Sequence, residues 1–384
     1  MENRIRLSSG LITTFLFIIS CISFFDFTIF EVLQEYFKYV FMISMVVIFI
    51  LECRKLPRKQ AMIFAVIMTY FLFVSIKNKL SMGSYFTIVS GISAIYCYSL
   101  VELNKIEQRI CNLFAVVLYF YIILISVRHY GNWLSNEGVE KIINPNTYSF
   151  ILVYLTVFLS YSISSGIQRN KPKKILMRLL YTFSTIAVFF LKSRGALLGI
   201  IFCVFLQSKF IRRKFEKAEN KLKVNEILML AFYIGGAALP LIYCKVVNHL
   251  IENGVYLVIR GKDIYTRYYV WNLLIEELSS KATYILFGLS NLENFEALQY
   301  VHNNSLSIIG YTGIVGFILY YMLLRKSVVN VIDTLDIDNI LYYAGFTSVF
   351  VIGLTESSTF WAVLYGFEFM LLCGRSKKEK YNST

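Results

Sequence analysis

Apolar runs near twenty residues recur along most of this 384-residue chain and alternate with short charged segments. As a helix, a run of this length matches the roughly 30 Å hydrocarbon core of a bilayer. Hydrophobic residues make up 57% of the sequence and charged residues only 16%, a composition too apolar for a soluble domain. The chain is therefore predicted to be an all-α integral membrane protein, with one polytopic domain over residues 1–384.

About twelve transmembrane helices are predicted from these runs, some of them short for a full crossing. The first run passes Cys21, which follows a sequence loosely similar to a lipoprotein processing box, and continues to Phe30. An uncleaved first helix is the preferred interpretation. The seven cysteines lack CxxC or metal-ligand spacing, so neither a disulfide framework nor a zinc site is indicated. The predicted spans are 11–30, 36–51, 61–76, 84–101, 110–127, 148–163, 175–191, 196–208, 227–246, 305–324, 340–354 and 360–373.

The net charge of +14 comes largely from the short loops between these runs. With the N-terminus inside, the inner segments hold 26 of the 38 Lys and Arg residues, as loops retained in the cytoplasm should. Both termini are therefore predicted to be cytoplasmic. This distribution argues against nucleic-acid binding, which needs basic residues gathered on one face. A specific anionic-lipid site is left open beside the orienting role of two basic groups, Arg212-Arg213-Lys214 and Lys171, Lys173 and Lys174.

Polar residues concentrate in residues 248–304, which are predicted to form one large extracytoplasmic loop. Within it, an apolar stripe at i, i+3, i+4 and i+7 predicts an amphipathic helix resting on the membrane or on other helices. A pore or carrier would instead show polar or Gly/Pro-broken residues at midplane, where this chain offers mainly Pro240 with Gly235 and Gly236. Pro240 is interpreted as a kink. The stripe consists of Trp271, Leu274, Ile275 and Leu278.

Three polar side chains on the predicted outer side could carry chemistry. Arg194 lies in a tight turn that Gly195 is predicted to permit, at headgroup depth, where a guanidinium binds phosphate through a rigid fork of donors. Arg267 lies one helical turn before Trp271. His302 precedes a predicted span and can accept a proton near neutral pH. The alternatives are a snorkelling arginine, a solvated interfacial arginine and an ordinary loop histidine.

Short motifs in this order resemble one known family. The chain is similar to the O-antigen ligase-like and Wzy-type polysaccharide polymerase superfamily over about residues 140–372, and the first 130 residues match only as generic helices. Gly288-Leu289-Ser290 replaces a G-x-G that is often found after the outer helix. The matching motifs are Asn144-Pro145-Asn146, Ser193-Arg194-Gly195-Ala196-Leu197-Leu198-Gly199, Arg267-x-x-x-Trp271 with Phe287-Gly288, and His302-Asn303 with Gly310, Gly313 and Gly316.

The resemblance implies a glycosyltransferase at the extracytoplasmic face of a bacterial cell membrane. It would move a glycan from a polyprenyl-diphosphate-linked oligosaccharide to an acceptor hydroxyl, without metal or other cofactor. Arg194 and Arg267 would stabilise the leaving diphosphate, and His302 would act as the base. The candidate substrate-binding residues are Asn303, Trp271, Tyr268, Arg260 and Glu356, with packing as the alternative for the aromatic ones.

A polymerase of O-antigen, capsule or exopolysaccharide repeat units is the preferred interpretation, because polymerases are the more varied group. Membrane lipids, a flippase and a chain-length regulator would be its partners. A ligase acting on another acceptor, a flippase or transporter of lipid-linked oligosaccharide, and a protein without activity stay open. Asp26, Glu31 and Glu35 also keep a metal-dependent transferase open.

Overall fold

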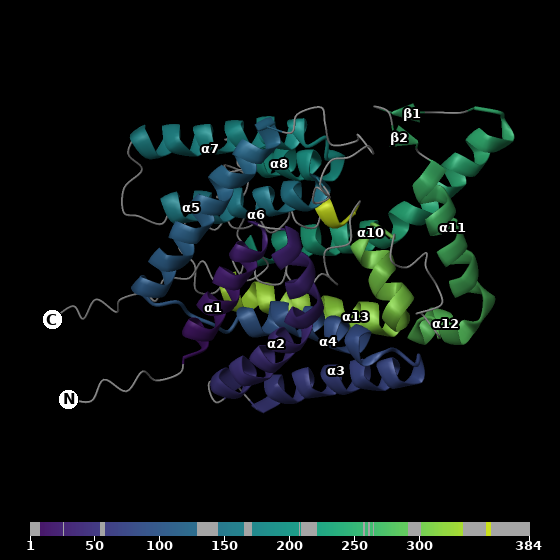
Figure 1. Ribbon diagram of the computed structural model, residues 1–384. Coiled ribbons are helices and arrows are strands. Elements are labelled where there is room, and N and C mark those ends of the chain that lie inside the picture. The colour runs from purple at the N-terminus through teal and green to yellow at the C-terminus, as the bar shows by residue number, and fades with distance from the viewer. Residues whose placement is uncertain are drawn as a thin grey trace.

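The protein, seen here as a computed structural model (Figure 1), is described over residues 8–25, 27–53, 58–128, 145–164, 171–206, 208, 221–255, 258–259, 262–263, 265–290, 301–332 and 351–354. The regular secondary structure in this part of the chain is helical apart from the antiparallel pair β1 (Val258–Ile259) and β2 (Lys262–Asp263). The principal helices are α1 (Ser9–Ser23), α2 (Phe27–Cys53), α3 (Arg58–Lys77), α4 (Met82–Tyr98), α5 (Lys105–Arg128), α6 (Pro145–Ser164), α7 (Lys171–Phe190), α8 (Arg194–Leu206), α10 (Lys221–Glu252), α11 (Tyr265–Ser280), α12 (Ala282–Phe287) and α13 (Asn304–Ile332).

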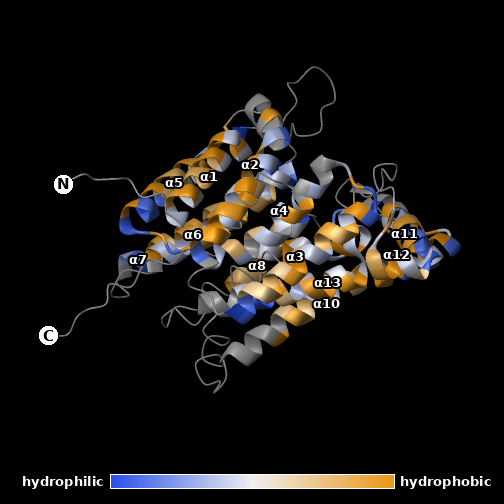
Figure 2. Ribbon diagram, turned by 90° about the horizontal axis from the view of Figure 1, so that it is seen from below, coloured by the Kyte–Doolittle hydropathy of each residue, from blue (hydrophilic) through white to orange (hydrophobic). Residues whose placement is uncertain are grey.

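Five helices in the described residues are long and apolar enough to cross a bilayer. Figure 2 shows hydrophobic colouring along most of the bundle and hydrophilic colouring near the labels α7 and α11. The structure thus supports the predicted membrane class, while the number of spans and the sidedness stay predictions. The five candidate spans are Arg58–Lys77, Lys105–Arg128, Pro145–Ile163, Met229–Glu252 and Asn304–Ser327.

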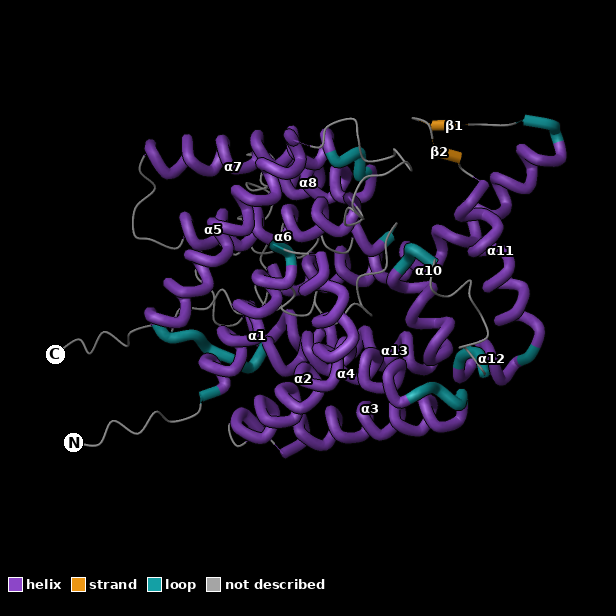
Figure 3. The backbone as a smooth tube through the Cα atoms, in the orientation of Figure 1, coloured by secondary structure: helices purple, strands orange, loops and turns teal. Residues whose placement is uncertain are grey.

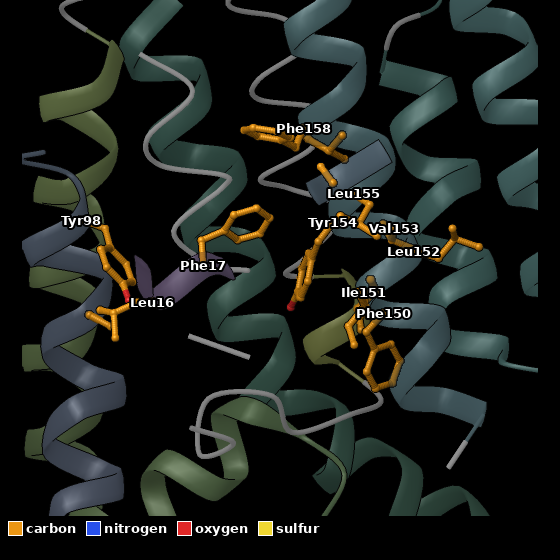
Figure 4. Close-up of a cluster of buried hydrophobic side chains, with 14 of the residues drawn as sticks. Leu16, Phe17, Tyr98, Phe150, Ile151, Leu152, Val153, Tyr154, Leu155 and Phe158 are labelled. Carbon is orange, nitrogen blue, oxygen red and sulfur yellow. The ribbon is translucent and has the colours of Figure 1, made fainter. Parts of the chain in front are cut away.

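Helix α6 forms the centre of the bundle. Every residue from Thr147 to Ser160 is buried, because α5, α7 and α8 pack around it. The cluster in Figure 4 joins this helix to α1, whose Phe17 ring lies 6.5 Å from that of Phe158. Helix α3 differs, since Met62 and Ile76 are 68% and 70% exposed on one side. Exposed side chains of this kind suit contact with lipid, whereas α6 is enclosed by protein.

The first predicted span, 11–30, is wrong in its boundary. Helix α1 ends at Ser23 and α2 begins at Phe27. The hydroxyl groups of Ser20 and Ser23 donate to backbone carbonyls within α1, and the Phe24 N–H bonds to the Cys21 carbonyl only three residues back. Such local bonds compete with regular helical pairing. The apolar run is therefore divided between two helices.

Helix α11 lies across one end of the bundle, at a steep angle to α3 and α7 (Figures 1 and 3). This end, where α12 also lies, is called the α11 end below. The residues of the predicted stripe lie against other helices: Trp271, Leu274 and Leu278 are buried and Ile275 packs beside them. Helix α10 has 32 residues and extends about 48 Å, which is longer than a hydrocarbon core is thick. Helix α11 packs against it. The resulting α11 cluster consists of Cys244, Trp271, Leu274, Leu278, Leu289, Val301 and Leu306.

Helix α13 is broken at Gly313, where φ is 69° and ψ is −177°. Figure 1 shows the two parts of α13, drawn in yellow-green, running in different directions. A Cβ at Gly313 would overlap the backbone of Leu286 and Phe287 in α12, so only glycine allows this approach. Gly288, also at positive φ, approaches the Tyr311 backbone in the same way. The close packing that the glycine spacing predicts thus takes the form, at Gly313, of a joint between α12 and α13.

The carbonyl groups released by this break are bonded by donors from other segments. Without these donors, each carbonyl oxygen would be a buried acceptor without a hydrogen-bond partner. Asn78, at the end of α3, also bonds the Phe287 carbonyl at 2.9 Å and so ties α3 to both helices. The donors are Leu289 N–H to Gly310 O at 2.9 Å, Asn78 Nδ2 to Tyr311 O at 3.1 Å and Tyr70 O–H to Thr312 O at 2.8 Å.

Candidate functional site

His302 lies directly before α13 in a left-handed backbone conformation, with φ at 46°. This region costs a non-glycine residue on the order of 1–3 kcal/mol, so the neighbouring structure must hold it there. Val301 on one side and Asn303 on the other are buried and fixed by hydrogen bonds. The His302 side chain is partly exposed between them. The chain therefore keeps an imidazole at a strained, accessible position.

Trp271 connects α11 to this histidine. Its indole N–H donates to the carbonyl oxygen of Val301, the residue before His302. The ring is 2% exposed and packs edge-on against Tyr243 at 5.1 Å, which gives Trp271 a packing role rather than an open stacking face. Arg267 is partly exposed one turn earlier on the same helix. The bond from Trp271 thus fixes the Arg267 helix relative to the His302 segment.

Tyr268 links α11 to α10 on the side facing solvent. Its hydroxyl donates to the Oδ1 atom of Asn248 at 3.1 Å. The centroid of its ring lies 5.4 Å from that of the Tyr269 ring. Desolvation, followed by the nearby Cys244 and Glu276, raises the pKa of Tyr268. The Tyr268 hydroxyl therefore stays protonated at neutral pH and can serve as a donor.

Asn303 is completely buried at the N-cap of α13 and uses both ends of its amide. Its Oδ1 accepts from the Leu306 N–H at 2.7 Å, the usual capping bond. Its Nδ2 donates to Gly236 O of α10 at 3.0 Å and to Leu354 O at 2.9 Å. These bonds join α13 to α10 and to residues 351–354. Asn303 therefore orients the chain next to His302.

Arg194 begins α8 after the turn 191–193. The left-handed residue of this turn is Lys192, with φ at 55°, whereas Gly195, expected to make the turn, lies inside α8. Ser193 occupies the N-cap position, yet its Oγ atom is buried without a hydrogen bond and the residue is 2% exposed. Serine at this position normally bonds a first-turn N–H. A buried hydroxyl, a helix N-terminus and a guanidinium together suit an anion.

The structure brings these elements to one end of the bundle. The turn between α7 and α8 and the start of α13 both lie toward the α11 end in Figures 1 and 3. The hydrogen bond from Trp271 joins the Arg267 helix to the His302 segment. Arg194, which begins α8, thus lies toward the same end of the bundle as the His302 segment. A cavity common to Arg194, Arg267 and His302 stays a prediction.

Several predicted residues lie outside the described residues: Asn144, Arg260, Glu356 and Asp26. Pro145 and Asn146 begin α6. Of the acidic residues considered for a metal, Glu35 is exposed on α2. In the described ranges, no group of three or more His, Cys, Asp or Glu side chains comes together.

Sequence reasoning missed Asn78, Tyr70 and the unused hydroxyl of Ser193. Asn78 follows an apolar run, where a polar residue signals only the end of a helix. Its partners Phe287 and Tyr311 lie more than 200 residues later in the chain. No local pattern in the sequence indicates a contact of that kind.

Comparison with known proteins gave no match among family models, curated proteins or solved structures.

Proposed function

We propose that the protein is a membrane polymerase of bacterial surface polysaccharide. It joins repeat units of an O-antigen, capsule or exopolysaccharide that are carried on polyprenyl diphosphate. The observation that carries this proposal is the strained His302, held between Val301 and Asn303 beside the Arg267 helix. Strained residues held by rigid neighbours cluster at active sites. A flippase that delivers the units and a chain-length regulator are the expected partners.

The residues suit glycosyl transfer without a metal. The acceptor hydroxyl oxygen forms a bond to the anomeric carbon of the donor as the bond from that carbon to the diphosphate oxygen breaks. The bonding electrons leave with the diphosphate, and His302 takes the hydroxyl proton. Arg194 and Arg267 stabilise the growing negative charge, and the free hydroxyl of Ser193 adds a donor beside Arg194. Arg260, Tyr268 and Glu356 remain candidates for binding the glycan.

The break in α13 favours a second candidate, a flippase or transporter of lipid-linked oligosaccharide. Broken helices form the substrate and ion sites of many transporters, where freed carbonyl groups serve as ligands. In this protein the carbonyls of Gly310, Tyr311 and Thr312 already accept hydrogen bonds from protein donors. The break therefore resembles a structural joint, and transfer chemistry is the better-supported function.

Purified protein in lipid nanodiscs, supplied with lipid-linked repeat units, tests the proposal. A polymerase releases polyprenyl diphosphate and lengthens the glycan, whereas empty nanodiscs do neither. Lengthening only after lipid A core or another acceptor is added would identify a ligase. Movement of intact units across proteoliposome membranes, with no lipid diphosphate released, would identify a flippase and contradict the proposal.

Arg194→Lys is expected to lower polymer synthesis about tenfold or more, because lysine keeps the charge but loses the forked donor geometry. The measurement is polyprenyl diphosphate released per minute by purified variant protein. Arg178→Lys is the matched control, since Arg178 is exposed on α7 and is not part of the proposed site. Polymer of normal length and amount from Arg194→Lys would limit Arg194 to an orienting role.

A further inference from the structure

Pro240 lies inside α10 and changes the hydrogen bonding of that helix. Proline has no backbone N–H, and its ring clashes with the carbonyl four residues earlier. In α10 that carbonyl belongs to Gly236. The oxygen of Gly236, a buried residue, therefore lacks its regular helical donor.

Asn303 supplies the donor that Pro240 removes. Its Nδ2 bonds Gly236 O at 3.0 Å. The absence of a side chain at Gly236 makes the approach possible, since a Cβ there would lie 2.5 Å from the Oγ of Ser305. Ser305 also donates to the carbonyl of Tyr233, one turn earlier on α10, at 3.2 Å. Asn303 and Ser305 thus donate to two backbone carbonyls of α10, and these bonds join α10 to the start of α13 directly after His302.

We infer that Pro240 is a positioning residue for His302, acting through the freed carbonyl of Gly236 and the amide of Asn303; this inference rests on the proposed function. Proline inside a helix lowers stability relative to alanine. In α10, the proline leaves the Gly236 carbonyl oxygen available as an acceptor for Asn303. Asn303 is then held on two sides, by Gly236 and by Leu354, and its neighbour His302 is fixed in the left-handed conformation.

Pro240→Ala restores an N–H that competes with Asn303 for the Gly236 oxygen. The expected result is a thermal midpoint equal to or above that of the unaltered protein, together with a kcat about tenfold lower, the effect of losing one coupled contact. KM for the lipid-linked donor should change little, because the change acts on the base rather than on donor binding. The acidic limb of the pH–rate profile, which reports the base, should also shift.

Two further variants complete the test. Asn303→Asp keeps the capping acceptor but removes both donors, so it should lower kcat as Pro240→Ala does, and it serves if that variant fails to fold. The double variant should be no slower than the slower single one, since both changes break the same bond. Pro172→Ala is the matched control, because Pro172 is exposed in the first turn of α7, where proline is tolerated.

The outcomes separate the inference from the proposed function. A normal kcat in Pro240→Ala, or additive losses of kcat in the double variant, would overturn the positioning role of Pro240. The proposed polymerase function would still stand in that case, because the protein is active. An inactive unaltered protein would overturn the function, and the positioning of a base with it. In that case the thermal midpoints of the single and double variants still report whether Pro240 and Asn303 are coupled.

Discussion

Replacing His302 with alanine is expected to abolish long polymer and to slow transfer by about 10²–10⁴-fold, the usual contribution of a general base. Single repeat units should still reach the cell surface, since delivery by the flippase is unaffected. The measurement is the distribution of glycan lengths in cells carrying the variant, together with turnover by purified protein. His249→Ala is the matched control, because His249 is exposed near the end of α10. Long chains at normal level from His302→Ala would remove the base assignment.

A comparison of two His302 variants separates catalysis from stability. Alanine and glycine both remove the imidazole, but only glycine is relaxed at a φ of 46°. The glycine variant should therefore be more stable than the alanine variant by about 1 kcal/mol. Both should be equally inactive. Equal stability would mean that the left-handed conformation is not maintained in the membrane.

Replacing Gly313 with alanine is expected to prevent normal folding. The added Cβ would overlap backbone atoms of Leu286 and Phe287, which cannot rotate away as a side chain could. If α12 moves aside, the carbonyls of Gly310, Tyr311 and Thr312 lose their donors, at about 1–3 kcal/mol for each buried group. Together with the strain of φ at 69°, these losses approach the whole stability of a typical domain.

The measurement is the yield of monodisperse protein in detergent and its thermal midpoint. Gly235→Ala is the matched control, because Gly235 lies within α10 and nothing is within 4 Å of an added Cβ. That variant should be as stable as the unaltered protein, or more stable by about 0.5–1 kcal/mol. A normal yield and midpoint for Gly313→Ala would contradict the joint between α12 and α13.

The sequence predicted the helices better than it predicted how they end. Predicted spans overlap α3, α5, α6, α10 and α13, because burial in lipid and burial in protein select the same apolar residues. The break between α1 and α2 was missed, although Asp26 interrupts the apolar run there. At Gly313 the sequence offered only a glycine spacing, which predicts close packing but not a change of direction.

For the site, the sequence identified Arg267, His302 and Asn303 as chemically suitable but could not assign their partners. Trp271 is a predicted substrate-binding residue with packing as the alternative, and the structure buries its ring and directs its N–H to the carbonyl of Val301. The spacing of apolar residues indicates which side of α11 is buried, because that spacing is a property of one segment of the sequence. The partner of a side chain depends on residues tens or hundreds of positions away.

By itself, the sequence determined that this protein is helical, that its helices suit a membrane and that Trp271, Leu274, Ile275 and Leu278 recur at helical spacing. These features follow from hydrophobicity and spacing within a single segment. Only the tertiary structure decided that α6 is the enclosed centre, that α13 is broken and bonded to α3, and that Pro240 leaves Gly236 O for Asn303. The physical reason is hydrogen bonding, because a buried donor or acceptor must find a partner that is near in space, whatever its distance in the sequence.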